Sequence, residues 1–176
     1  MSLTKKYEGY SSFSYLEAGK DYKSFDLADE LTRVPPYTLP LSEEDETRVR
    51  SLIDASLLVS MHEHVGVFPD KIQETPEYAR HGRMHTAFKG LAASHWDCVF
   101  DNLMDGICHI HSSSGWQWDD VLHDLGMRLC DLAHQDFVLH CQRIGDVQRA
   151  HDEGKVAWVA TMEGAAMIEH DLDRID

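Results

Sequence analysis

The chain has 176 residues, of which 43% are hydrophobic, and this is enough for one ordinary globular core. Its 31 acidic and 16 basic residues give a formal charge of −15, which would repel nucleic-acid phosphates and anionic lipids. Lys5 and Lys6 are not followed by an apolar stretch, so no secretory signal is expected. Together with four widely spaced cysteines, these features predict a cytoplasmic protein with reduced thiols that binds neither nucleic acid nor membranes.

The first 41 residues are predicted to form an amino-terminal extension, called the arm below. Aromatic and charged residues are mixed over residues 10–37 without a clean period, and Pro35, Pro36 and Pro40 favour extended backbone. The aromatic content favours packing over disorder. We therefore expect the arm to lie over a core formed by residues 42–176.

A short amphipathic helix is predicted immediately after the arm. Ser42 is a favourable N-terminal cap, and acidic residues follow it in the first turn. Val49, Leu52 and Ile53 then recur at helical spacing, so they should share one apolar face.

The apolar run of residues 57–61 predicts a buried strand, and it ends in two histidines. Because side chains alternate along a strand, His62 and His64 should leave its end on the same face. Two imidazoles that point the same way can hold one metal ion. In barrel hydrolases the chemistry occurs at this end of the strands, which makes the pair a candidate metal site.

A second His-x-His pair, His109 and His111, carries a weaker signal. Twelve histidines make about one such pair expected by chance, so the surrounding sequence has to separate the two pairs. His109 and His111 run directly into the serine- and glycine-rich residues 112–115, which are typical of a loop. The pair that follows a predicted strand is therefore the better ligand candidate.

The sequence of residues 67–105 gives the least definite prediction of secondary structure. Residues 67–83 are polar and contain two prolines, which predicts a long connection that either covers a site or is a plain surface loop. Residues 84–105 leave two readings open. Apolar residues within 88–92 have helical spacing, while residues 93–100 could form a strand.

The carboxyl-terminal third alternates between helices and strands. An apolar stripe predicts a helix over residues 119–133, and residues 137–139 form a short predicted strand. A second helix over 144–152 and a buried strand over 156–161 follow. This rhythm is typical of a parallel sheet and places the chain in the α/β class.

Glu163 follows the last predicted strand and precedes Gly164. A carboxylate at the end of a parallel strand is well placed to bind a metal, and the glycine allows a close approach of backbone or ligand. A solvated loop carboxylate is the simpler alternative. On the residues alone, Glu163 is a candidate third ligand beside His62 and His64.

Residues 144–164 resemble the membrane (renal) dipeptidase family of zinc peptidases in the amidohydrolase superfamily. In that family a helix and a Glu-Gly-Lys turn, here Glu153 to Lys155, lead into a strand that ends in Glu-Gly, here Glu163-Gly164. The resemblance extends more loosely over residues 52–176. It implies a (β/α)8 TIM-type barrel with two zinc ions, both bridged by Glu163, and with His62 and His64 on the more buried ion.

Two features depart from the family pattern. The first strand usually ends in His-x-Asp, whereas this chain has His62-Glu63-His64, a form found in other amidohydrolases. Residues 165–167 replace the family's second glycine and following histidine. The remaining metal ligands of the family come from later strands, so we expect residues 42–176 to form only the amino-terminal portion of such a barrel.

The resemblance implies a zinc-dependent hydrolase that cleaves the amide bond of a dipeptide or an N-acyl amino acid. Its catalytic residues beyond the metal ligands stay unknown. Two alternatives remain open: a non-catalytic scaffold or interaction domain, and an amidohydrolase acting on lactones or phosphoesters. A partial barrel would also expose strand edges and apolar surface, which favours a homo-oligomer.

Overall fold

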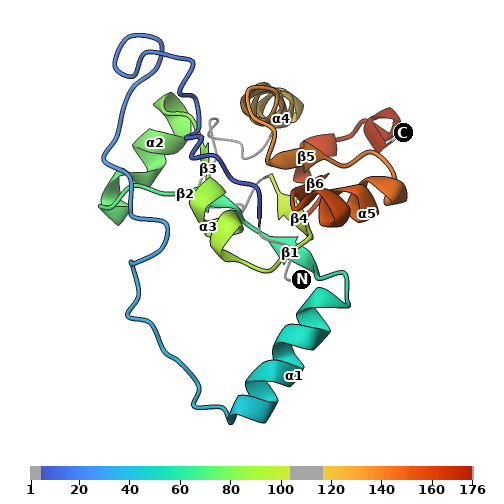
Figure 1. Ribbon diagram of the computed structural model, residues 1–176. Helices are drawn as coiled ribbons and strands as arrows, with labels where there is room; N and C mark the ends of the chain where they lie inside the picture. Colours follow the sequence, from blue (N-terminus) through green and yellow to red (C-terminus); the bar gives the residue numbers. More distant parts are fainter. Residues whose placement is uncertain (1–4, 104–116, 176) are drawn as a thin grey trace.

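The computed structural model describes residues 5–103 and 117–175, which form a mixed α/β fold around a four-stranded sheet (Figure 1). The strands follow the order β1-β4-β6-β5 across the sheet, and each is parallel to its neighbours. All four carboxyl ends therefore lie at one edge, which is called the carboxyl edge below. The bounds are Val59–Glu63 for β1, Cys98–Asn102 for β4, Val138–His140 for β5 and Val156–Thr161 for β6.

Helices and a small antiparallel pair of strands complete the described fold. The pair consists of β2, Gly66–Val67, and β3, His85–Thr86. The α-helices are α1 (Glu43–Asp54), α2 (Thr75–His81), α3 (Phe88–Ala93), α4 (Trp118–Leu132) and α5 (Ile144–Glu153). Short 3-10 turns cover Ile72–Glu74, Ala166–Ile168 and Leu172–Ile175.

The predicted parallel α/β sheet is confirmed, but the described residues form no barrel. In a (β/α)8 barrel each strand pairs with the next main strand of the chain. Here β4 pairs directly with β6, and β5 lies outside β6 at the edge of the sheet. The sheet therefore stays open, with β1 at one edge and β5 at the other.

The central strands β4 and β6 are buried because apolar side chains cover both of their faces. Side chains alternate along β6, so Val156 and Trp158 face a larger cluster, while Ala157 faces a smaller one under α5. Burial of each large side chain contributes roughly 1.5–3 kcal/mol. The larger cluster also contains Val65, Phe88, Leu91, Val99, Leu103, Val121, Leu132, Phe137, Val138 and Met167.

The first strand differs from its prediction in position and in burial. It spans Val59–Glu63 instead of residues 57–61, so His62 lies inside the strand and His64 follows it. The expectation of a buried strand is wrong, because β1 is an edge strand that pairs, within the described residues, only with β4. Val59 and Met61 are exposed as a result.

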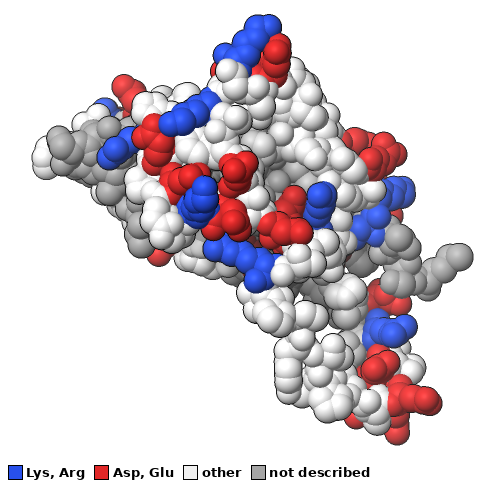
Figure 2. All heavy atoms as spheres, turned by 90° about the vertical axis from the view of Figure 1, so that its left-hand side faces the viewer, with Lys and Arg blue, Asp and Glu red and all other residues white. Residues whose placement is uncertain are grey.

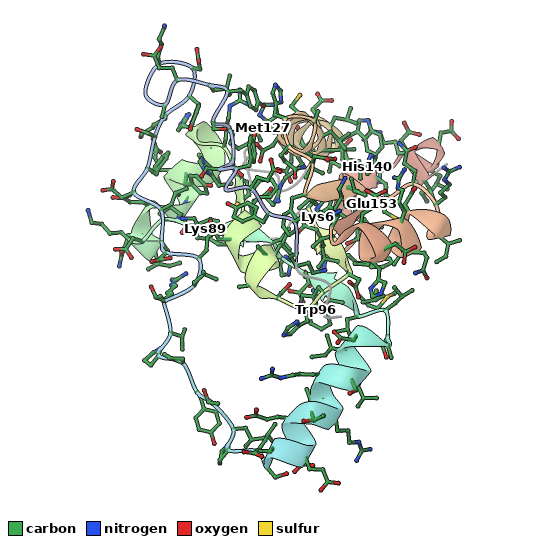
Figure 3. The ribbon with its side chains drawn as sticks, in the orientation of Figure 1. Lys6, Lys89, Trp96, Met127, His140 and Glu153 are labelled. Carbon is green, nitrogen blue, oxygen red and sulfur yellow. The ribbon has the colours of Figure 1, made fainter. Side chains whose placement is uncertain are left out.

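The predicted amphipathic helix is present as α1, but its apolar face is largely exposed, and only Ile53, near its carboxyl end, is partly buried. Ser42 caps it as expected, since its hydroxyl accepts a hydrogen bond from the backbone N–H of Asp45 at 3.1 Å. None of its residues is buried, and Val49 and Leu52 are exposed. Figure 1 shows α1 extending away from the sheet, and Figure 3 shows its side chains projecting into open space.

The connection over residues 67–83 contains a helix that the sequence did not reveal. Pro76 lies in the first turn of α2, where a missing N–H costs nothing, and Tyr78 is buried. Its phenol accepts a hydrogen bond from the backbone N–H of His85 at 2.9 Å, which ties the end of the connection to β3.

The first part of the arm packs on the core. Tyr7 and Tyr10 pack against the larger cluster, and Phe13 is fully buried. The hydroxyl of Tyr10 and the backbone N–H of Phe13 both donate to a carboxylate oxygen of Asp131, at 2.7 and 2.8 Å. Farther along the arm, apolar side chains are exposed at Leu31, Val34, Tyr37, Leu39 and Leu41.

Charge is mixed over the face formed by the arm and α2. Figure 2 shows basic side chains interspersed among acidic ones there, without a uniform patch of one sign. Lys23 and Glu77 illustrate this pattern, because they pair at 2.7 Å across the arm and α2. In the described part of the chain, no helix combines the length and the apolar character needed to cross a bilayer.

Candidate metal centre

The structure brings together His62, His64 and Glu163, the three side chains selected from the sequence. The Nε2 atoms of His62 and His64 lie 3.8 and 3.7 Å from the same carboxylate oxygen of Glu163. One ligand atom from each residue can be chosen so that all lie within 4.8 Å of one another. Residues that are about 100 positions apart in the chain thus converge at the carboxyl edge.

This donor set fits a divalent metal such as zinc. Zinc binds histidine nitrogen and carboxylate oxygen at about 2.0–2.2 Å, which places tetrahedral ligand atoms about 3.3–3.6 Å apart. The two histidine–glutamate separations, 3.7 and 3.8 Å, are close to that range, while all three pairs lie within 4.8 Å. The three side chains are partly solvent-exposed, so small rotations can bring them to bonding distance.

The positions of the ligands follow from the parallel sheet. His62 lies near the end of β1, and Glu163 lies just beyond β6. Gly164 has a φ of 85°, a left-handed conformation that glycine adopts without steric cost, and it turns the chain directly after Glu163. Because β4 separates β1 from β6, the candidate site spans the carboxyl end of the central strand.

Asp101, a buried residue of β4, fixes the backbone next to His64. Its Oδ1 accepts a hydrogen bond from the backbone N–H of Val65 at 3.1 Å. Its Oδ2 accepts from Trp158 Nε1 at 2.8 Å and from Arg128 Nη1 at 3.2 Å. Through these contacts Asp101 connects the end of β1 to β6 and α4.

Arg128 balances the buried charge of this network. It is 4% exposed, and it lies 3.2 Å from Asp101 and 3.8 Å from Asp124. Burial alone would lower the pKa of Arg128, but the carboxylates of Asp101 and Asp124 raise it above its ordinary value. The guanidinium therefore stays charged beneath the candidate site.

Glu63 lies between the two histidines in sequence but does not join the cluster. Regular alternation would place Glu63 on the opposite face, but the pairing of β1 with β4 shifts register between Ser60 and Glu63. The Oε1 atom of Glu63 accepts a hydrogen bond from the Ser60 hydroxyl at 2.6 Å, which engages the carboxylate within β1.

Sequence reasoning missed Asn102, which ends β4 beside the candidate site. Asn102 is buried and lines a small hollow together with His64, Leu103 and Arg128. The available signal was the polar pair Asp101-Asn102 at the end of an apolar strand. That pair was hidden because the sequence left residues 84–105 undecided between helix and strand.

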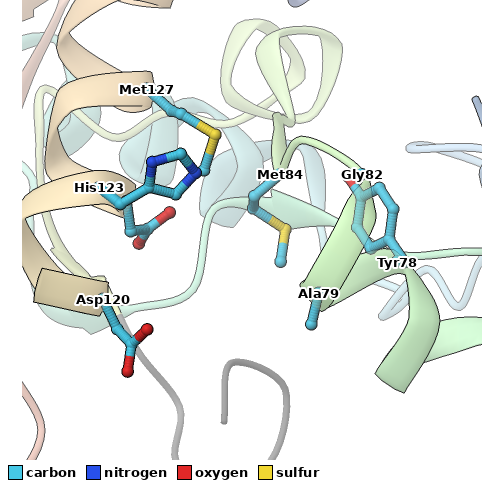
Figure 4. A pocket seen from close by; sticks show the side chains of 8 residues that line it. Tyr78, Ala79, Gly82, Met84, Asp120, His123 and Met127 are labelled. Atoms are coloured by element: carbon cyan, nitrogen blue, oxygen red, sulfur yellow. The ribbon is translucent and has the colours of Figure 1, made fainter. Parts of the chain in front are cut away.

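A second small hollow lies between α2 and α4 and does not gather metal ligands. Figure 4 shows Asp120, His123 and Met127 of α4 on one side, Tyr78 and Ala79 of α2 on the other, and Met84 between them. Among residues 5–103 and 117–175, the group of His62, His64 and Glu163 is the one cluster with metal-binding geometry. The weaker pair His109 and His111 falls outside the described residues.

Comparisons with known proteins found no relative of this chain. No protein-family model matches it, and neither curated proteins nor solved structures gave a significant match. The candidate site is therefore interpreted from its own geometry and chemistry.

Proposed function

We propose that the protein is a metal-dependent amide hydrolase that uses zinc at the carboxyl edge of the sheet. The observation that carries this proposal is the convergence of His62, His64 and Glu163 on one point. Ligands in open α/β sheets bind outside the carboxyl ends of the strands, and the cluster lies in that location.

The donor set is that of a catalytic rather than a structural zinc site. Structural sites enclose the ion with four protein ligands, whereas catalytic sites use three and leave room for water and substrate. Bound zinc would activate a water molecule at neutral pH and polarise the scissile carbonyl. His62, His64 and Glu163 would hold the ion, and Asp101 keeps the backbone beside His64 in place.

The proposed substrates are dipeptides or N-acyl amino acids, because residues 144–164 resemble the membrane dipeptidase family. That resemblance also implies a two-zinc centre in a (β/α)8 barrel, which Glu163 would help to hold. Such a barrel requires further strands and a position for β5 between β4 and β6. The edge position of β5 is where the described fold departs from this part of the proposal.

Two further candidate functions rest on specific features. The His62-Glu63-His64 form is shared with other amidohydrolases and supports lactones or phosphoesters as substrates. The exposed apolar residues of α1 and β1 support a non-catalytic scaffold that binds other chains through these surfaces.

One experiment on four proteins separates these functions. Zinc affinity is measured by calorimetry for the wild type, His62→Ala, Glu163→Ala and the control His81→Ala, whose exposed histidine lies on α2. Hydrolysis of a dipeptide, a lactone and a phosphoester is then measured with zinc present. We expect zinc binding and dipeptide hydrolysis in the wild type and the control, and the loss of both in the two site variants.

Other outcomes would change the conclusion. Equal zinc affinity in all four proteins would overturn the metal site. Hydrolysis of only the lactone or phosphoester would replace the proposed substrate class. Tight zinc binding without hydrolysis of any of the three would favour the non-catalytic scaffold.

A further inference from the structure

We propose that the side-chain amide of Asn102 binds a neutral carbonyl oxygen of the ligand at the candidate metal centre. This inference rests on the proposed function and deepens it, because it names the ligand group that the protein recognises beside the metal. The side-chain Nδ2 of Asn102 is a buried donor without a hydrogen-bond partner among the described residues.

Asn102 is 6% exposed, and only one end of its amide is satisfied. Its Oδ1 accepts a hydrogen bond from the Thr161 hydroxyl at 2.9 Å, whereas its Nδ2 makes no hydrogen bond with any described residue. Exchanging the amide oxygen and nitrogen does not remove the problem, since a hydroxyl can donate or accept and one amide atom stays unpaired. Buried polar groups are nearly always hydrogen-bonded, so we expect a ligand atom to accept a hydrogen bond from this donor.

The space for such a partner lies next to His64. Asn102 and His64 line the same hollow, whose free volume of about 10 Å³ accommodates one water-sized group. The hollow is open on the outside, so one atom of a larger ligand can enter it. Because His64 belongs to the candidate metal centre and also lines this hollow, the hollow lies beside the place where a metal-bound ligand would sit.

The surrounding charge favours a neutral acceptor over an anion. Arg128 also lines the hollow, but the carboxylates of Asp101 and Asp124 lie within 3.2 and 3.8 Å of its guanidinium. The positive charge is thus already compensated by two acidic groups. A peptide or N-acyl carbonyl oxygen accepts a hydrogen bond without adding a further negative charge, which matches this environment.

The test reads the Asn102 amide directly by nuclear magnetic resonance. The side-chain NH2 signals of the ¹⁵N-labelled protein are assigned by their disappearance in Asn102→Asp. Two probes are then titrated into the protein with and without zinc. N-acetylglycine N-methylamide carries only neutral amide carbonyls, whereas acetate carries a carboxylate.

We expect the neutral amide to shift the Asn102 signals in a saturable manner in the zinc-loaded protein. Asn102→Ala should weaken binding of this probe about tenfold, the effect of losing one hydrogen bond. Asn102→Asp keeps the shape but removes the donor, so it should weaken the probe similarly. Because Asn102 is not a metal ligand, zinc affinity should stay within about twofold of the wild type in Asn102→Ala.

Each contrary result has a distinct meaning. Unshifted Asn102 signals, or equal probe affinity in wild type and Asn102→Ala, would overturn the carbonyl subsite and leave a bound water as the partner. A shift with acetate alone would overturn it in favour of a carboxylate. Absence of zinc binding in the wild type would instead overturn the proposed function, and the titration without zinc would still decide whether Asn102 binds a carbonyl.

Discussion

Histidine and acidic side chains gather both at the carboxyl edge and at the amino edge, where the parallel strands begin. The two groups differ in whether hydrogen bonds within the chain fix their side chains. At the amino edge, Asp97 is buried and accepts hydrogen bonds from the backbone N–H of Leu58 at 2.9 Å and from Lys5 at 3.2 Å. His151 adds an ion-pair contact at 3.1 Å. At the carboxyl edge, no hydrogen bond within the described residues fixes the side chains of His62, His64 or Glu163.

This difference in hydrogen bonding distinguishes side chains that stabilise the fold from side chains that are available to bind a ligand. The carboxylate oxygens of Asp97 accept hydrogen bonds from within the chain, so they are already used by the fold. Side chains that converge without fixed partners, as at the carboxyl edge, keep their ligand atoms available for an ion. The same residue types therefore stabilise the fold at one edge and form a candidate site at the other.

The largest expected effect concerns the buried network beneath the carboxyl edge. Arg128→Met leaves the fully buried carboxylate of Asp101 without its ion-pair partner, which should cost about 3–5 kcal/mol of unfolding free energy. Urea unfolding followed by tryptophan fluorescence measures this cost. The double variant Asp101→Asn/Arg128→Met removes both charges and should recover part of the loss. A change below about 1 kcal/mol in Arg128→Met would show that the network does not support this edge.

The next effect tests the amino edge alone. Asp97→Asn keeps the shape of the side chain but removes the charge that faces Lys5 and His151, which should destabilise the fold by about 1–3 kcal/mol. The affinity for zinc should not change, because Asp97 lies at the opposite end of β4. Loss of zinc binding in this variant would contradict the assignment of separate roles to the two edges.

A smaller effect on stability and zinc affinity is expected at Glu63, which lies beside the candidate ligands. Glu63→Gln preserves an acceptor for the Ser60 hydroxyl, so stability should change by less than about 0.5 kcal/mol. Zinc affinity should stay within about twofold, in contrast to Glu163→Gln, which changes a proposed ligand. A large loss of zinc affinity in Glu63→Gln, measured by calorimetry, would mean that the cluster includes the wrong carboxylate.

The smallest effect belongs to a histidine outside both edges. Burial lowers the pKa of His85, whose ring contacts Phe13 of the arm with a centroid distance of 5.3 Å. The unfolded chain therefore binds a proton more readily, so this contribution to stability is complete above the ordinary histidine pKa of about 6.5 and declines as the pH falls below it. His85→Gln should flatten that part of the stability profile. An unchanged profile in urea titrations between pH 5 and pH 7 would refute this origin.

Several elements could be predicted from the sequence because their signals are local. The strand over residues 156–161 has the predicted bounds, since an apolar run begins just after Gly154, whose left-handed conformation ends α5. The proximity of His62, His64 and Glu163 also followed from their positions at or just beyond the carboxyl ends of parallel strands.

Other features depend on contacts that a sequence does not display. The apolar residues of β1 suggested burial, but an apolar run does not say which element covers it, and β1 is an exposed edge strand. The order of the strands depends on pairing between distant segments. The polar pair Asp101-Asn102 was a weak signal in the sequence, but the unpaired amide nitrogen of Asn102 is visible only after its neighbours are placed.

The pairing of β4 with β6 has a consequence for the order in which the molecule assembles. β4 ends at Asn102, whereas its second partner strand begins at Val156. A ribosome must therefore synthesise 53 intervening residues (103–155) before β4 and β6 can begin to pair. Until then one edge of β4 stays unpaired, and pairing over such a distance is intrinsically slow. Glu163 emerges later still. In refolding of the full chain, the same long-range pairing should make the site that joins β1 to β6 one of the last features to form. The onset of metal binding would mark its completion.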